Sequence, residues 1–193
     1  MTKGSLPTRR QAAGIIYFLL LLLAALGLTG TGDTARLTRL VQTTQPGLYS
    51  VEVVYDGDTI GVNIDGRTEK VRLIGVDTPE KNHPQKPVQC FAERAAEFTA
   101  TLIGSRRVRL EADPVNQNRD RYGRLLRYVY LDDGTEINAE IIAQGYGFAY
   151  LSFPFIKAEN YRRLEAGARE QSLGLWRACE VELNDGFIST NPV

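Results

Sequence analysis

Between residues 49 and 76, hydrophobic and polar positions alternate with the period of two that is typical of half-buried β-strands. Asp56-Gly57-Asp58 interrupts the alternation with turn residues, and Asp65-Gly66 is a strong hairpin signal. The third apolar stretch ends before Pro79, because proline cannot continue a β-ladder. The pattern therefore predicts three consecutive antiparallel strands, the third over 68–76.

Further along the chain the apolar spacing becomes helical, and then returns to a period of two. Apolar residues recur every three or four positions over 91–102, and Gly104 ends the pattern. Residues 107–111 and 125–131 then read as a fourth and a fifth strand. Three strands, a helix and two strands are the order of an OB-fold barrel. Two more helical patterns complete an α+β fold, a five-stranded barrel with about three packed helices; they cover 137–144 and 156–171.

The N-terminal segment has a different character. Residues 13–28 carry no charge and follow the basic residues Lys3, Arg9 and Arg10, as in an export signal. The run is somewhat short for a spanning helix, which needs about 20 residues. We therefore expect either a cleaved signal peptide or an N-terminal membrane anchor, both of which place the later residues outside the cytoplasm. The predicted boundaries are leader or anchor 1–30, polar linker 31–46, globular domain 47–180 and C-terminal tail 181–193.

Charge and histidine content restrict the chemistry. Lysine plus arginine and aspartate plus glutamate number 23 each, so the bulk charge gives no sign of a polyanionic partner. Basic residues must therefore act locally. His83 is the only histidine, which excludes mechanisms that need two histidines. One histidine and two cysteines also leave a zinc site incomplete. We expect His83 to be a solvated loop residue.

The two cysteines, Cys90 and Cys179, lie far apart in the sequence. In an exported chain a pair of cysteines predicts one disulfide, here between the start of the first helix and the end of the domain. The alternative is two free thiols.

Acidic residues mark the junctions of the first three predicted strands. Asp58 lies at one junction and Asp77 at another, and turn ends of neighbouring strands can lie close together. Arg72 lies between Val71 and Leu73 in an otherwise apolar strand, where a charge requires an anionic partner. Two carboxylates with a carbonyl and water make an all-oxygen site, which suits calcium or magnesium rather than zinc.

A second arginine, Arg124 in the segment DRYGR, extends this group. Together with Arg72 it suits a phosphate, which a guanidinium binds through paired N–H groups. Glu80 is a spare carboxylate that can accept a proton from water. Taken alone, Asp58 or Glu80 fits an ordinary turn or helix entry better than a catalytic role. The combination predicts metal-assisted phosphodiester hydrolysis.

The motifs DGDT, RLIGVDTPE and DRYGR, in this order and at these separations, resemble the signature of the staphylococcal nuclease (thermonuclease) family. The resemblance runs from about Tyr49 to Trp176 and identifies 47–180 as the nuclease-like domain. It implies a calcium-dependent nuclease that hydrolyses DNA or RNA to 3′-phosphorylated products, so nucleic acid is the expected partner.

The same resemblance implies a role for each motif residue. The expected calcium ligands are Asp58, Asp77 and the backbone carbonyl of Thr78. The expected catalytic residues are Arg72 and Arg124 on the phosphate and Glu80 as the general base. Tyr150 corresponds to a tyrosine that lines the family's nucleotide pocket, while Ser152 stands where the family has a second one. From its own chemistry, Tyr122 is a candidate for stacking on a base.

One alternative stays open at this level. An OB-fold can hold nucleic acid without cutting it, and some relatives of the nuclease fold have kept only binding. The balanced net charge and Ser152 are compatible with a catalytically weak or inactive binding module, exported or membrane-anchored.

Overall fold

The computed structural model describes residues 45, 47–81, 87–184 and 187–193. The predicted leader, His83 and almost all of the predicted linker lie outside these residues. Within the described part of the chain, no helix is both long enough and apolar enough to cross a membrane.

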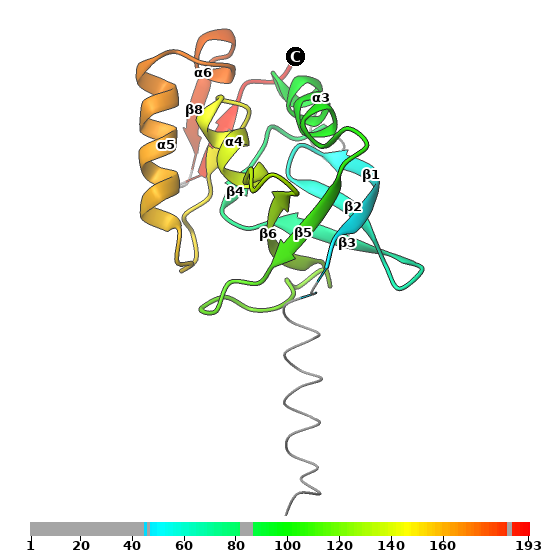
Figure 1. Ribbon diagram of the computed structural model, residues 1–193. Coiled ribbons are helices and arrows are strands. Elements are labelled where there is room, and N and C mark those ends of the chain that lie inside the picture. The colour runs from blue at the N-terminus through cyan, green and yellow to red at the C-terminus, as the bar shows by residue number, and fades with distance from the viewer. Residues whose placement is uncertain (1–44, 46, 82–86, 185–186) are drawn as a thin grey trace, which may run out of the picture. The chain divides into compact units, whose positions relative to one another are not determined.

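Five strands close into a barrel in the order β1-β2-β3-β6-β5, and β5 pairs back onto β1 (Figure 1). The pair β3–β6 is parallel and the other pairs are antiparallel. This is the predicted OB-fold topology, so the predicted fold class is confirmed. The barrel strands are β1 (Tyr49–Asp56), β2 (Thr59–Ile64), β3 (Arg67–Leu73), β5 (Arg107–Glu111) and β6 (Leu125–Leu131).

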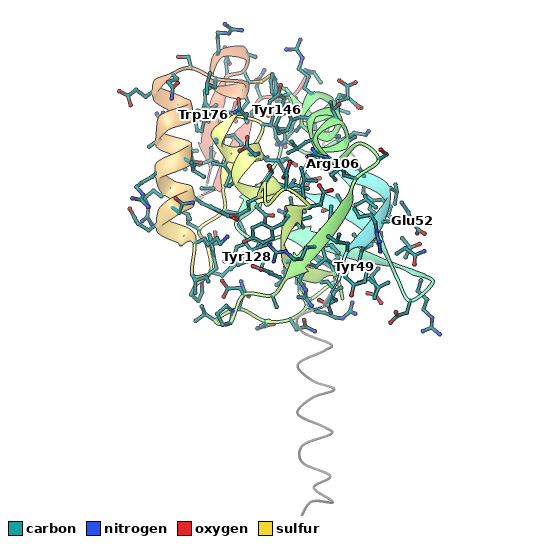
Figure 2. The ribbon with its side chains drawn as sticks, viewed as in Figure 1. Tyr49, Glu52, Arg106, Tyr128, Tyr146 and Trp176 are labelled. Atoms are coloured by element: carbon teal, nitrogen blue, oxygen red, sulfur yellow. A yellow bond between two sulfur atoms is a disulfide. The ribbon has the colours of Figure 1, made fainter. Side chains whose placement is uncertain are left out.

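The core fills the barrel and the space under the helices. Every residue of β6 is buried, because this strand pairs with β3 on one side and β5 on the other. Tyr128 of β6 lies in this interior (Figure 2), and its hydroxyl donates a hydrogen bond to Asp113 at 2.5 Å. The polar end of the ring is thereby satisfied inside an apolar core.

Helices pack around the barrel. The helix α3 (Ala92–Ile103) lies against β1, and α4 (Ile137–Ala143) packs against both β6 and α5 (Ala158–Glu170). These match the three predicted helices to within two residues at each end. A further four-residue helix, α6 (Leu175–Ala178), was not predicted, because one turn is too short to show a helical period.

The third strand is shorter than predicted. Instead of running to Val76, β3 ends at Leu73, and Gly75 turns the chain with a φ of +70°. A Cβ at Gly75 would lie 2.5 Å from the Phe155 ring, so only glycine fits at this turn. The next two residues form a separate short strand that leaves the barrel and pairs with residues of the later chain. These strands are β4 (Val76–Asp77) and β7 (Phe148–Ala149).

The C-terminal residues, which we expected to form a tail, fold into a hairpin of β8 (Val181–Asn184) and β9 (Phe187–Thr190). The backbone after this hairpin is held against the segment that leads into α3, since Cys90 N–H donates to Asn191 O at 2.8 Å. Cys90 also forms a disulfide with Cys179, with 5.9 Å between the two Cα atoms. The expectation of a tail was wrong because these long-range contacts leave no local pattern in the sequence.

The disulfide generates a prediction about stability. It joins residues 89 positions apart, and closing so long a loop restricts the unfolded chain. The double variant Cys90→Ser/Cys179→Ser should lose about 2–4 kcal/mol in free energy of unfolding. Urea unfolding checks this, with reduced wild-type protein as the control that should behave like the variant. An unchanged unfolding midpoint in both samples would contradict the prediction.

Candidate active site

The acidic turn between β1 and β2 is fixed from three sides. Asp58 O accepts the Leu73 N–H at 2.9 Å, which ties the turn to the end of β3. Thr99 of α3 donates its hydroxyl to Gly57 O at 2.7 Å. Oδ1 of Asp58 accepts the Thr59 hydroxyl at 2.9 Å. The Asp58 carboxylate is therefore buried and held in one orientation.

A second acidic segment, at the end of β4, meets this turn. The backbone N–H and the hydroxyl of Thr78 both donate to Oδ2 of Asp58, at 2.9 and 3.1 Å. Asp77 comes directly before and keeps its side chain 36% exposed. Residues 20 positions apart in the sequence thus share one hydrogen-bond network. The structure therefore brings Asp58, Asp77 and Thr78 together.

Arg72 lies between the two aspartates. Its Nη1 is 2.5 Å from Oδ2 of Asp58, and its Nη2 is 2.8 Å from Oδ1 of Asp77. Burial alone would lower the pKa of Arg72, but Asp58, Asp77 and Glu80 together raise it above its ordinary value. The contact to Asp58 lacks hydrogen-bond geometry, so Nη1 is a buried donor without a hydrogen-bond acceptor among the described residues. A buried donor that lacks an acceptor within the protein can donate to an anionic ligand.

Asp56 belongs to this site as well, and the sequence analysis missed it. Its carboxylate accepts the N–H groups of Gly57 at 2.9 Å and Lys81 at 3.4 Å. Burial is the main cause that raises the pKa of Asp56 to about 7, and the negative charges of Asp58 and Glu80 act in the same direction. In the sequence Asp56 looked like a turn residue; its spacing of two from Asp58 was the only available signal.

Glu80 stands at the edge of the same group. Its backbone N–H donates to Oε1 of Gln89 at 2.6 Å, and its carbonyl accepts the Gln89 N–H at 3.0 Å.

Burial, together with the charges of Asp58 and Glu80, also raises the pKa of Asp77 against the opposing effect of Arg72. Three carboxylates, those of Asp58, Asp77 and Glu80, thus act on one guanidinium, so that carboxylates outnumber the cation and leave an excess of negative charge.

This excess suits a cation. In the described part of the chain, no three His, Cys, Asp or Glu residues are grouped so as to hold a metal ion by side chains alone. Oδ1 of Asp58 and the second oxygen of Asp77 are not in the ion pairs with Arg72. Two carboxylate oxygens in a carboxylate-rich pocket fit a hard cation that completes its shell with carbonyl and water oxygens, as calcium does. The donor set therefore suits a hard cation such as calcium or magnesium better than zinc.

Arg124 is held separately from this group. Its backbone N–H and its Nε donate to the Asp120 carboxylate, at 3.0 and 2.7 Å. No ion pair or hydrogen bond joins Arg124 to Arg72, Asp58 or Asp77 within the residues that the structure describes. Arg124 directly precedes β6, whose second residue, Leu126, pairs in register with Arg72.

The two tyrosines singled out in the sequence have different surroundings. Tyr122 is 68% exposed, and its ring lies 5.4 Å from the Arg124 guanidinium. Tyr150 lines a cavity that also contains Asp77, so it lies at the acidic site.

A buried arginine that the sequence analysis did not consider supports the loop before β6. Arg127 donates to Oδ1 of Asn118 at 2.6 Å and to Oε1 of Gln45 at 2.5 Å. Burial, helped by the nearby Arg119 charge, lowers the pKa of Arg127 to about 10. Arg127 thereby fixes the start of the loop that carries Arg124. The sequence alone did not show whether the side chain of Arg127 faced the interior of the protein or the solvent.

Comparisons with known proteins agree with this geometry. Residues 70–178 match the family model described as staphylococcal nuclease homologue. The chain is 40% identical to a thermonuclease of Staphylococcus intermedius, over 66% of this chain and 75% of that protein. A thermonuclease of Staphylococcus hyicus is 39% identical with the same coverage. The endonuclease YncB of Bacillus subtilis is 37% identical, over 68% of this chain and 63% of that protein.

The packing around Gly57 generates a prediction. A Cβ at this position would lie 2.7 Å from Cγ2 of Thr78 and 3.0 Å from Cβ of Ala95. Gly57→Ala should therefore cost about 1–3 kcal/mol in stability, because it forces Thr78 away from Asp58. Gly167→Ala, inside α5 where the nearest atom is 3.9 Å away, should instead stabilise the protein by up to about 1 kcal/mol. Thermal unfolding distinguishes the two, and equal effects would contradict the close approach.

Proposed function

The chain belongs to the family of staphylococcal nuclease homologues and is a nuclease, and from this premise we propose that it is calcium-dependent and leaves 3′-phosphorylated products from DNA or RNA. The observation that carries the proposal is the Arg72 guanidinium between Asp58 and Asp77. A phosphate-binding donor and an acidic, cation-compatible pocket thereby share one buried location.

In this proposal the calcium ligands are the carboxylates of Asp58 and Asp77 and the carbonyl of Thr78. Calcium, when bound, polarises the phosphate and offsets its negative charge. Thr78 keeps Asp58 in place, because the backbone N–H and the hydroxyl of Thr78 both donate to Oδ2 of Asp58. Asp56 lies behind the site, and a bound cation would favour its charged form.

The arginines act on the reacting phosphate. Negative charge grows on the phosphoryl oxygens as water attacks phosphorus, and Arg72 and Arg124 neutralise it. Asp120 orients Arg124 through two hydrogen bonds, so little freedom is lost when the substrate binds. Glu80 orients the attacking water or takes its proton. The bond from phosphorus to the 5′ oxygen breaks, that oxygen receives a proton, and the phosphate stays on the 3′ side.

The location of the enzyme is also part of the proposal. The basic residues followed by the uncharged run 13–28 support export, either as a secreted protein or as one anchored to a membrane by this segment. A disulfide between Cys90 and Cys179 is compatible with an oxidising compartment.

The dependence on calcium is directly testable. Cleavage of single-stranded DNA and of RNA should require millimolar calcium and stop when a chelator is added. Calcium at about 100 times its dissociation constant should also stabilise the fold by about 2.7 kcal/mol. Asp58→Asn and Asp77→Asn should lose most of this stabilisation, while Glu97→Gln, an exposed residue of α3, should keep it. Undiminished cleavage in chelator would refute the calcium requirement.

The two catalytic assignments outside the acidic pair require a separate experiment. Glu80→Gln and Arg124→Ala should each lower turnover by about 10²–10⁴-fold without unfolding the domain. Arg67→Ala, an exposed arginine of the same strand as Arg72, is the matched control and should keep full turnover. Full activity of Arg124→Ala would contradict the catalytic role that we assign to Arg124. A folded wild-type protein that binds nucleic acid but never cuts it would indicate the binding module instead.

A further inference from the structure

A cavity of about 290 Å³ adjoins the acidic site, and we call it the Asp77 cavity. Tyr150 and Glu165 line it from the body of the protein. Leu183 of β8 and Ile188 of β9 line it from the C-terminal hairpin. The hairpin, which the family match at 70–178 does not reach, thus forms part of the wall next to a proposed calcium ligand.

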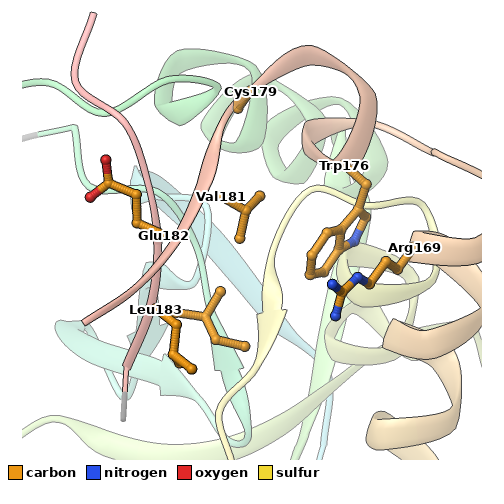
Figure 3. Close-up of a pocket in the computed structure, with 7 residues that line it drawn as sticks. Arg169, Trp176, Cys179, Val181, Glu182 and Leu183 are labelled. Atoms are coloured by element: carbon orange, nitrogen blue, oxygen red, sulfur yellow. The ribbon is translucent and has the colours of Figure 1, made fainter. Parts of the chain in front are cut away.

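A second cavity of about 480 Å³ lies beside the same hairpin, and we call it the Trp176 cavity. Figure 3 shows the Trp176 indole between Arg169 of α5 and Val181 of β8. The Arg169 guanidinium lies 5.5 Å from the centre of the indole ring. Glu182 of β8 also lines this cavity, which therefore contains one carboxylate as well as the Arg169 guanidinium.

The two cavities share one wall. Leu183 and Ile188 line both, and these two residues are direct cross-strand partners in the hairpin. On the opposite side, Phe148 of the Asp77 cavity contacts Trp176 edge-on, with 5.3 Å between ring centres. The two cavities are therefore neighbours beside the hairpin, one lined by Asp77 and the other by Arg169.

The lining indicates which part of a ligand each cavity takes. The Asp77 cavity combines aromatic and aliphatic side chains with two carboxylates, Asp77 and Glu165, and no cation among its lining residues. It suits a nucleobase, whose amino groups can donate to a carboxylate, and it repels a phosphate. The Trp176 cavity also has one carboxylate in its lining, that of Glu182, but unlike the Asp77 cavity it pairs an indole with a guanidinium that can donate to an anion while stacked. It suits one phosphate of a nucleic-acid strand together with the base of the next nucleotide.

We propose that the C-terminal hairpin is a substrate-binding element that guides a single nucleic-acid strand from the reacting phosphate to a second nucleotide subsite at Trp176 and Arg169. This inference rests on the proposed function only for the position of the reacting phosphate. The occupant is single-stranded, because stacking on a side chain requires bases that are free of a partner strand. The wall that the two cavities share places the subsite next to the cavity that Asp77 lines.

The hairpin is suited to this role because it is anchored at its base. Cys179 lies just before β8 and is bonded to Cys90, while Val193 N–H donates to Val88 O at 3.0 Å. Leu183, by contrast, is 73% exposed although it is apolar. An exposed leucine beside aromatic side chains is available to a base, and its substitution does not endanger the core.

Fluorescence offers a direct test, because Trp176 is the only tryptophan of the chain. The full chain carrying Glu80→Gln, used to suppress cleavage, is titrated with a single-stranded deoxyoctanucleotide in calcium buffer. We expect a saturable change of the Trp176 emission. Arg169→Gln should weaken binding about fivefold or more and lower the slope of log affinity against log salt by about 0.7. Leu183→Ser should weaken binding in the same range, without the change in salt slope.

The controls separate this inference from the proposed function. Arg163→Gln makes the same charge change on an exposed face of α5, outside both cavities, and should bind like the parent protein. A blunt duplex of the same sequence should bind at least about tenfold more weakly. Unchanged emission, or parent-like affinity of both Arg169→Gln and Leu183→Ser, would overturn the subsite. If wild type cuts nothing but these binding effects are seen, the proposed chemistry fails and the subsite stands.

Discussion

The central interaction of this protein is the ion triad of Arg72 with Asp58 and Asp77, in which Arg72 and Asp58 are largely removed from water. A guanidinium removed from water is tolerated only when carboxylates accompany it, and the buried Asp58 carboxylate needs the arginine for the same reason. The triad joins three segments: the turn after β1, the strand β3 and the short strand β4. Because all three are fixed by barrel pairing or by its immediate continuation, the charges cannot separate without disturbing the barrel.

The surrounding structure keeps this arrangement rigid. Asn138, buried on α4, donates to Ile74 O at 3.0 Å and accepts the Val129 N–H at 2.9 Å, so the end of β3 is tied to β6 and to a helix. Gly75 then allows the sharp turn that directs Asp77 back toward Asp58. Substrate-binding groups held by such contacts lose little freedom on binding, which favours stabilisation of charge in a transition state.

A balanced overall charge is compatible with a nucleic-acid substrate when the recognition is local. The net charge is zero, so long-range attraction of a polyanion is weak, and affinity must come from individual contacts. In our proposal Arg72 and Arg124 act on the reacting phosphate, and Arg169 and Trp176 beside the hairpin hold a second nucleotide. Apolar and aromatic surface near a few cations can hold a strand where bulk charge cannot.

Periodicity was sufficient to predict the barrel, its topology and the three long helices, because strand and helix periods are local properties of the chain. The motif residues likewise indicated the acidic pair and its arginine, since their types and order are visible in the sequence itself. Asp56, Arg127 and the C-terminal hairpin were beyond sequence reasoning. The pKa of Asp56 depends on burial and on charges from other segments. The hairpin depends on backbone hydrogen bonds to residues about 100 positions away. Such features are decided by which surfaces meet in three dimensions, and no local pattern encodes that meeting.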